Sequence, residues 1–161
     1  MEIERKFLIN TLPDGLSKYP SDTIRQAYIS TDPVIRVRQK SNDYILTIKS
    51  QGLLAREETE LPLSEESFSH LLKKADGIPI EKVRYRIPDS HGYLIELDIF
   101  RGAYEGFIMA EVEFPSVEEA LSYTPPSWFG QDVTDNPEFH NSRLSQRSKE
   151  EICEFLSALP Q

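Results

Sequence analysis

The chain has 161 residues, with 18 Lys and Arg against 27 Asp and Glu, and its formal net charge of −9 argues against a general nucleic-acid binder. No apolar run approaches the roughly 20 residues that a membrane-spanning helix needs, and the charged, alternating N-terminus is unlike a secretory signal. The single cysteine, Cys153, excludes an internal disulfide and a cysteine-rich metal site, so we expect a cytoplasmic protein. The length predicts a single domain over residues 1–161.

Apolar and charged residues alternate with a period of two along most of the chain, which predicts strands separated by turn-forming residues. The segment 41–43 divides two such runs with the spacing of a hairpin. The eight candidate strands cover residues 2–9, 24–29, 34–40, 44–49, 56–63, 82–87, 93–100 and 107–114.

Three helices are predicted. Residues 64–77 begin with a capping serine, carry acidic residues in the first turn and basic ones in the last, and end at a glycine. Residues 116–122 begin with Ser116, three positions before Glu119. The tail over about 142–159 places apolar residues on one helical face and ends at Pro160. The proline-rich stretch 124–141 is expected to be an ordered loop.

The charged residues of the predicted strands are sorted by strand, because side chains alternate between the two faces of each strand. Some strands present mainly cations on one face, and others present carboxylates. These faces carry Glu2, Glu4 and Lys6; Arg36, Arg38 and Lys40; Thr47 and Lys49; Arg56, Glu58 and Glu60; Lys82, Arg84 and Arg86; Glu96 and Asp98; and Glu111 and Glu113.

The pattern allows two arrangements. In the first, every charged face meets water and the sorting has no function. In the second, the sheet curls into an eight-stranded barrel with the charges inside. Since a dry interior cannot hold so many charges, such a lumen must be wet and contain a polyanion with hard divalent ions bound through oxygen. A triphosphate with its metal satisfies both sets of charges.

Several sequence blocks are similar to the CYTH superfamily, the triphosphate tunnel metalloenzymes. The opening Glu2-Ile3-Glu4-Arg5-Lys6 resembles the Glu-x-Glu-x-Lys signature of this family, and further blocks follow in the family's order over almost the whole chain. These blocks include residues 26–28, 35–38, 44–50, 56–60, 82–85, 95–98, 111–114 and 125–134.

The resemblance implies a mainly antiparallel α+β fold, with a closed eight-stranded β-barrel forming a tunnel and a few peripheral helices. It also implies an enzyme, a metal-dependent triphosphatase that hydrolyses inorganic triphosphate to pyrophosphate and phosphate. Two alternatives stay open: a class IV-type adenylate cyclase that converts ATP to cyclic AMP, and a protein that binds polyphosphate or nucleotide without catalysis.

Site residues follow from the resemblance position by position, with Mg²⁺ or Mn²⁺ as the cofactor. The metal ligands would be Glu2, Glu4, Glu111 and Glu113. The phosphate-binding residues would be Lys6, Arg36, Arg38, Lys49, Arg56, Lys82 and Arg84. The catalytic set would comprise Lys6, Glu58, Glu60, Glu96 and Asp98.

The chain departs from small bacterial relatives near its C-terminus. His140-Asn141-Ser142 stands where those relatives carry a Lys-Asn-Lys-like segment, so a family lysine is missing at one tunnel mouth. Protonated His140 could replace it, since an unperturbed histidine titrates near ~6.5. The tail after Leu144 could act as a lid or a dimer contact. We therefore expect a small triphosphate as ligand, no nucleic acid or membrane partner, and a possible homodimer.

Overall fold

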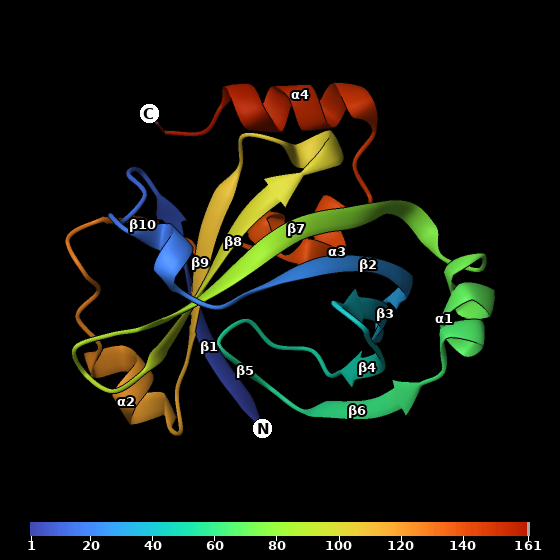
Figure 1. Cartoon of the computed structure of the whole chain (residues 1–161), viewed down its shortest axis with the longest axis horizontal. Helices are drawn as coiled ribbons and strands as arrows, with labels where there is room; N and C mark the ends of the chain where they lie inside the picture. The colour runs from blue at the N-terminus through green and yellow to red at the C-terminus, as the bar shows by residue number, and fades with distance from the viewer. Residues whose placement is uncertain (161) are drawn as a thin grey trace.

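The computed structural model describes residues 1–160 and is dominated by one antiparallel sheet (Figure 1). Its strands are β1 (Glu2–Ile9), β2 (Ser21–Thr31), β3 (Val34–Lys40), β4 (Asp43–Lys49), β5 (Ala55–Arg56), β6 (Glu58–Leu63), β7 (Asp76–Pro88), β8 (Leu94–Arg101), β9 (Ile108–Glu113) and β10 (Phe129–Asp132). The α-helices are α1 (Glu65–Leu72), α2 (Val117–Ser122), α3 (Asn141–Leu144) and α4 (Lys149–Ser157), with short 3-10 turns at Leu16–Lys18, Gly102–Tyr104 and Pro137–Phe139.

The strands form a nearly closed barrel, which confirms the predicted architecture. Hydrogen bonding follows the path β1-β9-β8-β7-β2-β3-β4-β6, and β5 returns to pair with β1. This seam contains two residue pairs, Glu2 with Arg56 and Ile3 with Ala55. The predicted strand 56–63 is thus interrupted at Glu57, where the chain passes from the seam to the pairing with β4. The other seven predicted strands correspond to β1–β4 and β7–β9.

The charged faces of the strands point into the barrel, and apolar faces point outward under the helices. Outside β1, β8 and β9, a buried cluster forms around Phe7, Leu97 and Val112, with Ala120 of α2 packed against it. Outside β2–β4, Phe68 of α1 packs in another cluster. The apolar core therefore lies between the sheet and its covering helices, and the barrel interior is left for polar groups.

One end of the barrel interior is filled with apolar side chains. Along the inward faces, Lys6 is followed by Leu8, Asp98 by Phe100, and Glu111 is preceded by Met109. These apolar residues are buried in one cluster with Leu144 of α3 and Ile152 of α4. Figure 1 shows α3 against the inside of the strand ring and α4 across the adjoining edge. The charged part of the interior is therefore confined to the opposite half.

The C-terminal segment differs from the single helix expected over about 142–159. It forms two helices, α3 and α4, because the chain turns at 145–148 and restarts at a capping box between Ser148 and Glu151. Within the turn, the Arg147 guanidinium is buried and donates hydrogen bonds to Glu138, at 2.7 Å to its carboxylate. This buried contact requires a bend that a continuous helix does not provide.

The helix expected over 64–77 ends earlier, at Leu72, and β7 already begins at Asp76. Ser64 does cap it, accepting a hydrogen bond from the backbone N–H of Ser67. Gly77 does not end the helix but lies where two backbone segments come close together. Its φ is +69°, and a Cβ at this position would lie 2.1 Å from the carbonyl oxygen of Ser145. The glycine thus lets the start of β7 contact the residue after α3.

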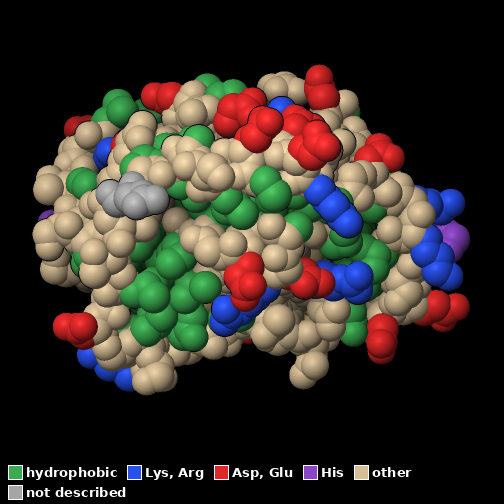
Figure 2. All heavy atoms as spheres, turned by 90° about the horizontal axis from the view of Figure 1, so that it is seen from above, with side chains coloured by type: hydrophobic (Ala, Val, Ile, Leu, Met, Phe, Trp, Pro, Cys, Tyr) green, Lys and Arg blue, Asp and Glu red, His purple; other side chains and the backbone are tan. Residues whose placement is uncertain are grey.

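The stretch expected to be a loop, 124–141, contains β10, which pairs with the C-terminal end of β1. Within residues 1–160 no helix is long and apolar enough to cross a membrane. On the face seen in Figure 2, acidic, basic and apolar side chains are interspersed, and basic residues do not dominate it. The single-domain organisation over 1–161 stays a prediction.

Candidate active site

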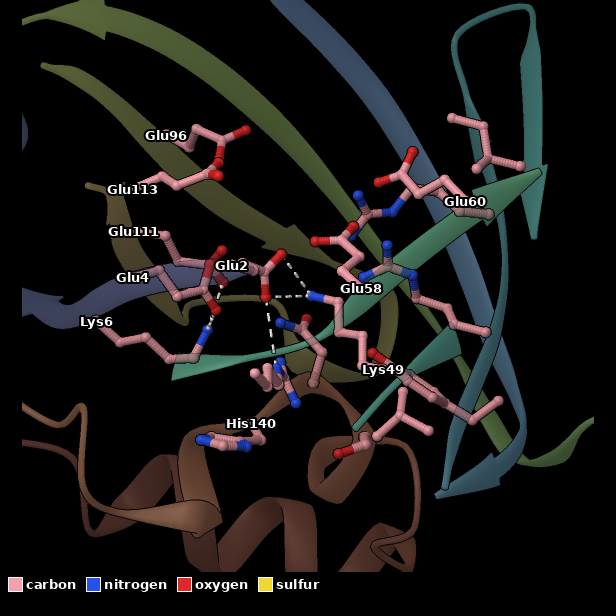
Figure 3. Close-up of a pocket in the computed structure, with 18 of the residues that line it drawn as sticks. Glu2, Glu4, Lys6, Lys49, Glu58, Glu60, Glu96, Glu111, Glu113 and His140 are labelled. Carbon is pink, nitrogen blue, oxygen red and sulfur yellow. Dashed lines mark hydrogen bonds and ion pairs between the residues drawn. The ribbon is translucent and has the colours of Figure 1, made fainter. Parts of the chain in front are cut away.

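The charged half of the barrel encloses a cavity of about 400 Å³ (Figure 3). It gathers side chains from nine strands, β1 to β9. Of the predicted site residues, Glu2, Glu4, Lys6, Arg36, Arg38, Lys49, Arg56, Glu58, Glu60, Arg84, Glu96, Glu111 and Glu113 line it. Lys82 and Asp98 are not among its lining residues and are fully buried.

Sequence reasoning missed part of the lining. Tyr28 and Lys40 follow the inward phase of their strands, so alternation carried a signal for both. Asn141 and Ser142 come from α3 and have no periodic signal, so only the resemblance indicated that their segment lies at one tunnel mouth. The cavity is thus lined by the sheet on most sides and by α3 on one.

One side of the cavity is acidic. In Figure 3 Glu96 and Glu113 lie beside each other on this side, with Glu111 and Glu4 nearby. Partial burial raises the pKa of the Glu113 carboxyl, and repulsion from surrounding carboxylates, first Glu2 and then Glu96, raises it further. This group of carboxylates therefore carries negative charge that the protein only partly compensates.

Lys6 lies at the bottom of the acidic side, between two carboxylates. Its ammonium is 2.5 Å from a carboxylate oxygen of Glu4 and 3.2 Å from one of Glu111. Burial by itself lowers the pKa of Lys6, but the attraction of Glu111 and Glu4 outweighs it and holds the pKa above its ordinary value. Lys6 is therefore a fixed cation that holds two of the predicted metal ligands.

The seam of the barrel carries another charged group. Lys49 donates to both carboxylate oxygens of Glu2, at 2.8 and 3.0 Å, and Arg56 lies 3.4 Å from the same carboxylate. Burial lowers the pKa of Lys49, and the nearby guanidinium of Arg36 adds to that effect. Two cations thus share one carboxylate here.

The opposite side of the cavity holds two arginines that form no ion pair with a carboxylate within residues 1–160. Arg36 is 6% exposed and donates to the hydroxyl of Thr47 at 3.1 Å, while its Nε has no partner. Arg38 donates to the amide oxygen of Gln26 at 2.7 Å. Burial lowers the pKa of Arg38 to about 9, with repulsion from Arg36 and Arg84 contributing. Arg36 and Arg38 attract the nearby carboxylate of Glu60, but neither guanidinium forms an ion pair within residues 1–160, so both are suited to bind an anion such as phosphate.

Behind the cavity wall, a buried ion-pair network fixes Arg84. Asp98 accepts hydrogen bonds from Arg84 Nε and Nη2 at 2.7 and 2.8 Å, and Lys82 Nζ lies 2.7 Å from the same carboxylate. The cations outweigh burial and hold the pKa of Asp98 below its ordinary value. The contact of Lys82 with phosphate and the catalytic role of Asp98 stay predictions, and in this structure the two side chains pair with each other below the cavity surface.

Replacing Asp98 with asparagine is expected to lower the free energy of unfolding by about 3–5 kcal/mol. The change leaves two buried cations, Arg84 and Lys82, without their shared counter-charge. Urea denaturation measures the loss. Glu81→Gln is the matched control, since Glu81 pairs with Arg25 on the exposed surface at 3.6 Å, and it should cost less than about 0.5 kcal/mol. Equal stability of the two variants would contradict the assigned network.

The donor set fits a hard divalent cation in its chemistry. The predicted ligands are all carboxylates, and Mg²⁺ and Mn²⁺ prefer oxygen. Glu113 is close enough to four other carboxylates for their repulsion to raise its pKa, a repulsion that a bound cation relieves. In the part of the chain that the structure describes, however, no three acidic, histidine or cysteine side chains are already gathered as ligands around one point. Glu4 and Glu111 are instead engaged by Lys6.

Comparison with known proteins extends these findings. The protein-family model for the CYTH domain matches residues 1–132. Two relatives carry the name inorganic triphosphatase. The protein from Nitrosomonas europaea is 41% identical over 150 residues, covering 89% of this chain and 96% of the relative. The protein from Acetivibrio thermocellus is 35% identical over 151 residues, covering 89% and 92%.

A solved structure has the same overall fold. The crystal structure of an inorganic triphosphatase superposes with a TM-score of 0.70 at 36% sequence identity, and the match covers 92% of this chain and 96% of that one. The likeness therefore extends beyond the region matched by the family model, into the C-terminal segment.

Proposed function

The chain belongs to the CYTH domain family, and we propose that it is a metal-dependent enzyme that hydrolyses inorganic triphosphate to pyrophosphate and phosphate. In this reaction the oxygen of water forms a bond to a terminal phosphorus. The bond from that phosphorus to the bridging oxygen breaks, and pyrophosphate leaves with the electron pair. The water protons pass to the products and to solvent.

The observation that carries the proposal is the division of charge across the cavity. On one side Arg36 and Arg38 form no ion pair with a carboxylate within residues 1–160, and on the other side the carboxylates around Glu113 repel one another. A polyanion compensates the first side and a divalent cation the second. A triphosphate with a bound metal ion supplies both the anion and the cation within this cavity of about 400 Å³.

Glu2, Glu4, Glu111 and Glu113 are the proposed metal ligands, with Mg²⁺ or Mn²⁺ as the metal. A bound divalent cation neutralises charge on phosphate oxygens and lowers the pKa of a coordinated water. Because Glu4 and Glu111 already hold Lys6, metal binding requires Lys6 to share or release them. We propose that a phosphate oxygen then takes the place of a carboxylate as the partner of Lys6.

The remaining lining residues divide by charge into two proposed roles. Arg36, Arg38, Lys49, Arg56 and Arg84 would contact phosphate oxygens, where guanidinium groups provide paired donors and Lys49 a compact charge. Glu58, Glu60 and Glu96 would orient water or the cations. Phosphoryl transfer relies chiefly on such positioning and charge neutralisation, so this division suffices for catalysis without a covalent intermediate.

The proposal is tested by offering the purified protein tripolyphosphate, ATP and thiamine triphosphate with Mg²⁺ or Mn²⁺ and identifying every product. We expect pyrophosphate and phosphate from tripolyphosphate at a higher kcat/KM than for either other substrate, and no turnover in EDTA. Cyclic AMP with pyrophosphate from ATP would support a cyclase instead. Tight binding of all three without turnover would support a non-catalytic binding protein.

Location and assembly are also proposals. The single cysteine, Cys153, is exposed and unpaired, which suits a reducing cytoplasm. A homodimer stays a prediction, and the proposed reaction requires only one chain.

A further inference from the structure

A second cavity of about 330 Å³ adjoins the first. The two share lining residues from β3, from β5, from the residue before α3 and from α3 itself: Val34, Arg56, His140 and Ser142. His140 therefore lies where the two cavities meet. Figure 3 shows its ring below Lys6, at the end of the cavity formed by the C-terminal segment.

The backbone of His140 is held on both sides. Its N–H donates to the carbonyl of Pro137 at 3.1 Å, and its carbonyl accepts from the N–H of Leu144 at 3.0 Å. The residue is only 9% exposed, yet its ring nitrogen Nε2 has no hydrogen-bond partner within residues 1–160. Buried polar atoms without a partner are rare and costly in native proteins, so this atom indicates a partner that comes from outside the chain.

The imidazole of His140 is neutral near pH 7. Burial lowers its pKa to about 4, and the nearby cations Lys6 and Arg56 contribute to this shift. A neutral imidazole carries one N–H donor and one acceptor nitrogen. Beside an anion it offers a donor without adding a further charge to a site that already has several cations.

We propose that His140 is a substrate-binding residue of this chain, which donates a hydrogen bond from Nε2 to an oxygen of the bound triphosphate. This inference rests on the proposed function, because triphosphate is the anion that the adjoining cations attract. It replaces the expectation that His140 acts only when protonated, since the neutral ring already provides the required donor. The hydrogen bond satisfies a buried ring nitrogen that has no partner within residues 1–160.

His140→Ala and His140→Gln test the proposal, with His70→Ala, an exposed histidine of α1, as the matched control. His140→Ala should raise the KM for tripolyphosphate at least tenfold and change kcat less than threefold. His140→Gln, whose amide provides a donor at similar reach, should return KM to within threefold of the wild type. His70→Ala should leave both constants unchanged. Thermal unfolding of each variant confirms that it is folded.

A second measurement separates this inference from the proposed function. Calorimetric titration with tripolyphosphate in EDTA measures anion binding without turnover, and His140→Ala should weaken it at least tenfold. A wild type that binds tripolyphosphate but does not hydrolyse it would overturn the proposed function alone. Equal binding and equal KM in the wild type and His140→Ala, or a loss confined to kcat, would overturn the role given to His140.

Discussion

Replacing Arg38 with methionine is expected to raise the KM for tripolyphosphate about 100-fold and, at the same time, to stabilise the protein in the absence of ligand. A charge-assisted contact with phosphate is among the strong hydrogen bonds of proteins, and a 100-fold loss corresponds to about 2.8 kcal/mol. Without phosphate, the Arg38 guanidinium lies in a partly buried position beside Arg36 and Arg84, and in the described part of the chain it forms no ion pair with a carboxylate. Its removal relieves repulsion that substrate binding otherwise compensates.

The gain in stability should be about 1 kcal/mol, because removal of the repelling charge outweighs the loss of the hydrogen bond to Gln26. Urea denaturation without ligand and steady-state kinetics with tripolyphosphate measure the two effects. Arg25→Met on β2 is the matched control, because Arg25 is half-exposed and pairs with Glu81 outside the barrel. A variant with lower stability and unchanged KM would show that Arg38 supports the fold rather than the substrate.

Replacing Glu113 with glutamine is expected to lower kcat in the presence of Mg²⁺ or Mn²⁺ by at least about 100-fold, through loss of an oxygen ligand and of its charge. The change keeps the shape of the side chain and leaves the ion pairs of Lys6 intact, since Glu113 forms none of them. Because neighbouring carboxylates raise the pKa of Glu113, the metal-free variant should be as stable as the wild type or more stable.

Mn²⁺ titration followed by calorimetry, in parallel with the kinetics, separates metal binding from folding. Glu105→Gln, in an exposed turn before β9, is the control and should retain wild-type activity and metal affinity. If Glu113→Gln binds Mn²⁺ as tightly as the wild type, Glu113 is not a metal ligand.

The period-two alternation was sufficient to predict the strands and which of their faces share a charge. Alternation alone left a solvated face and a barrel lumen both open, and the resemblance to the CYTH superfamily placed Glu4, Arg38 and Glu111 in one lumen, where all three line the cavity. Alternation gives the direction of a side chain but not its depth along the barrel axis. Lys82 and Asp98 share the inward phase, yet they lie next to the apolar end marked by Phe100 and are buried as a pair.

Features that depend on tertiary contacts were not predictable from local patterns. The two-residue strand β5 forms because the N-terminal end of β1 lies opposite it, and β10 forms because the C-terminal end of β1 is available for pairing. The break at 145–148 is accompanied by a partly buried contact between Arg147 and Glu138. The position of His140 inside the cavity likewise results from the way α3 packs into the barrel.

The measurement that tests the central claim most directly is diffraction from crystals grown with Mn²⁺ and an imido-bridged tripolyphosphate that resists hydrolysis. The charge division predicts an anomalous manganese peak in the cavity against Glu113 and neighbouring carboxylates, with phosphate oxygens contacting Arg36 and Arg38. Manganese or phosphates bound only on the outer surface of the barrel, with the cavity charges still paired among themselves, would contradict it.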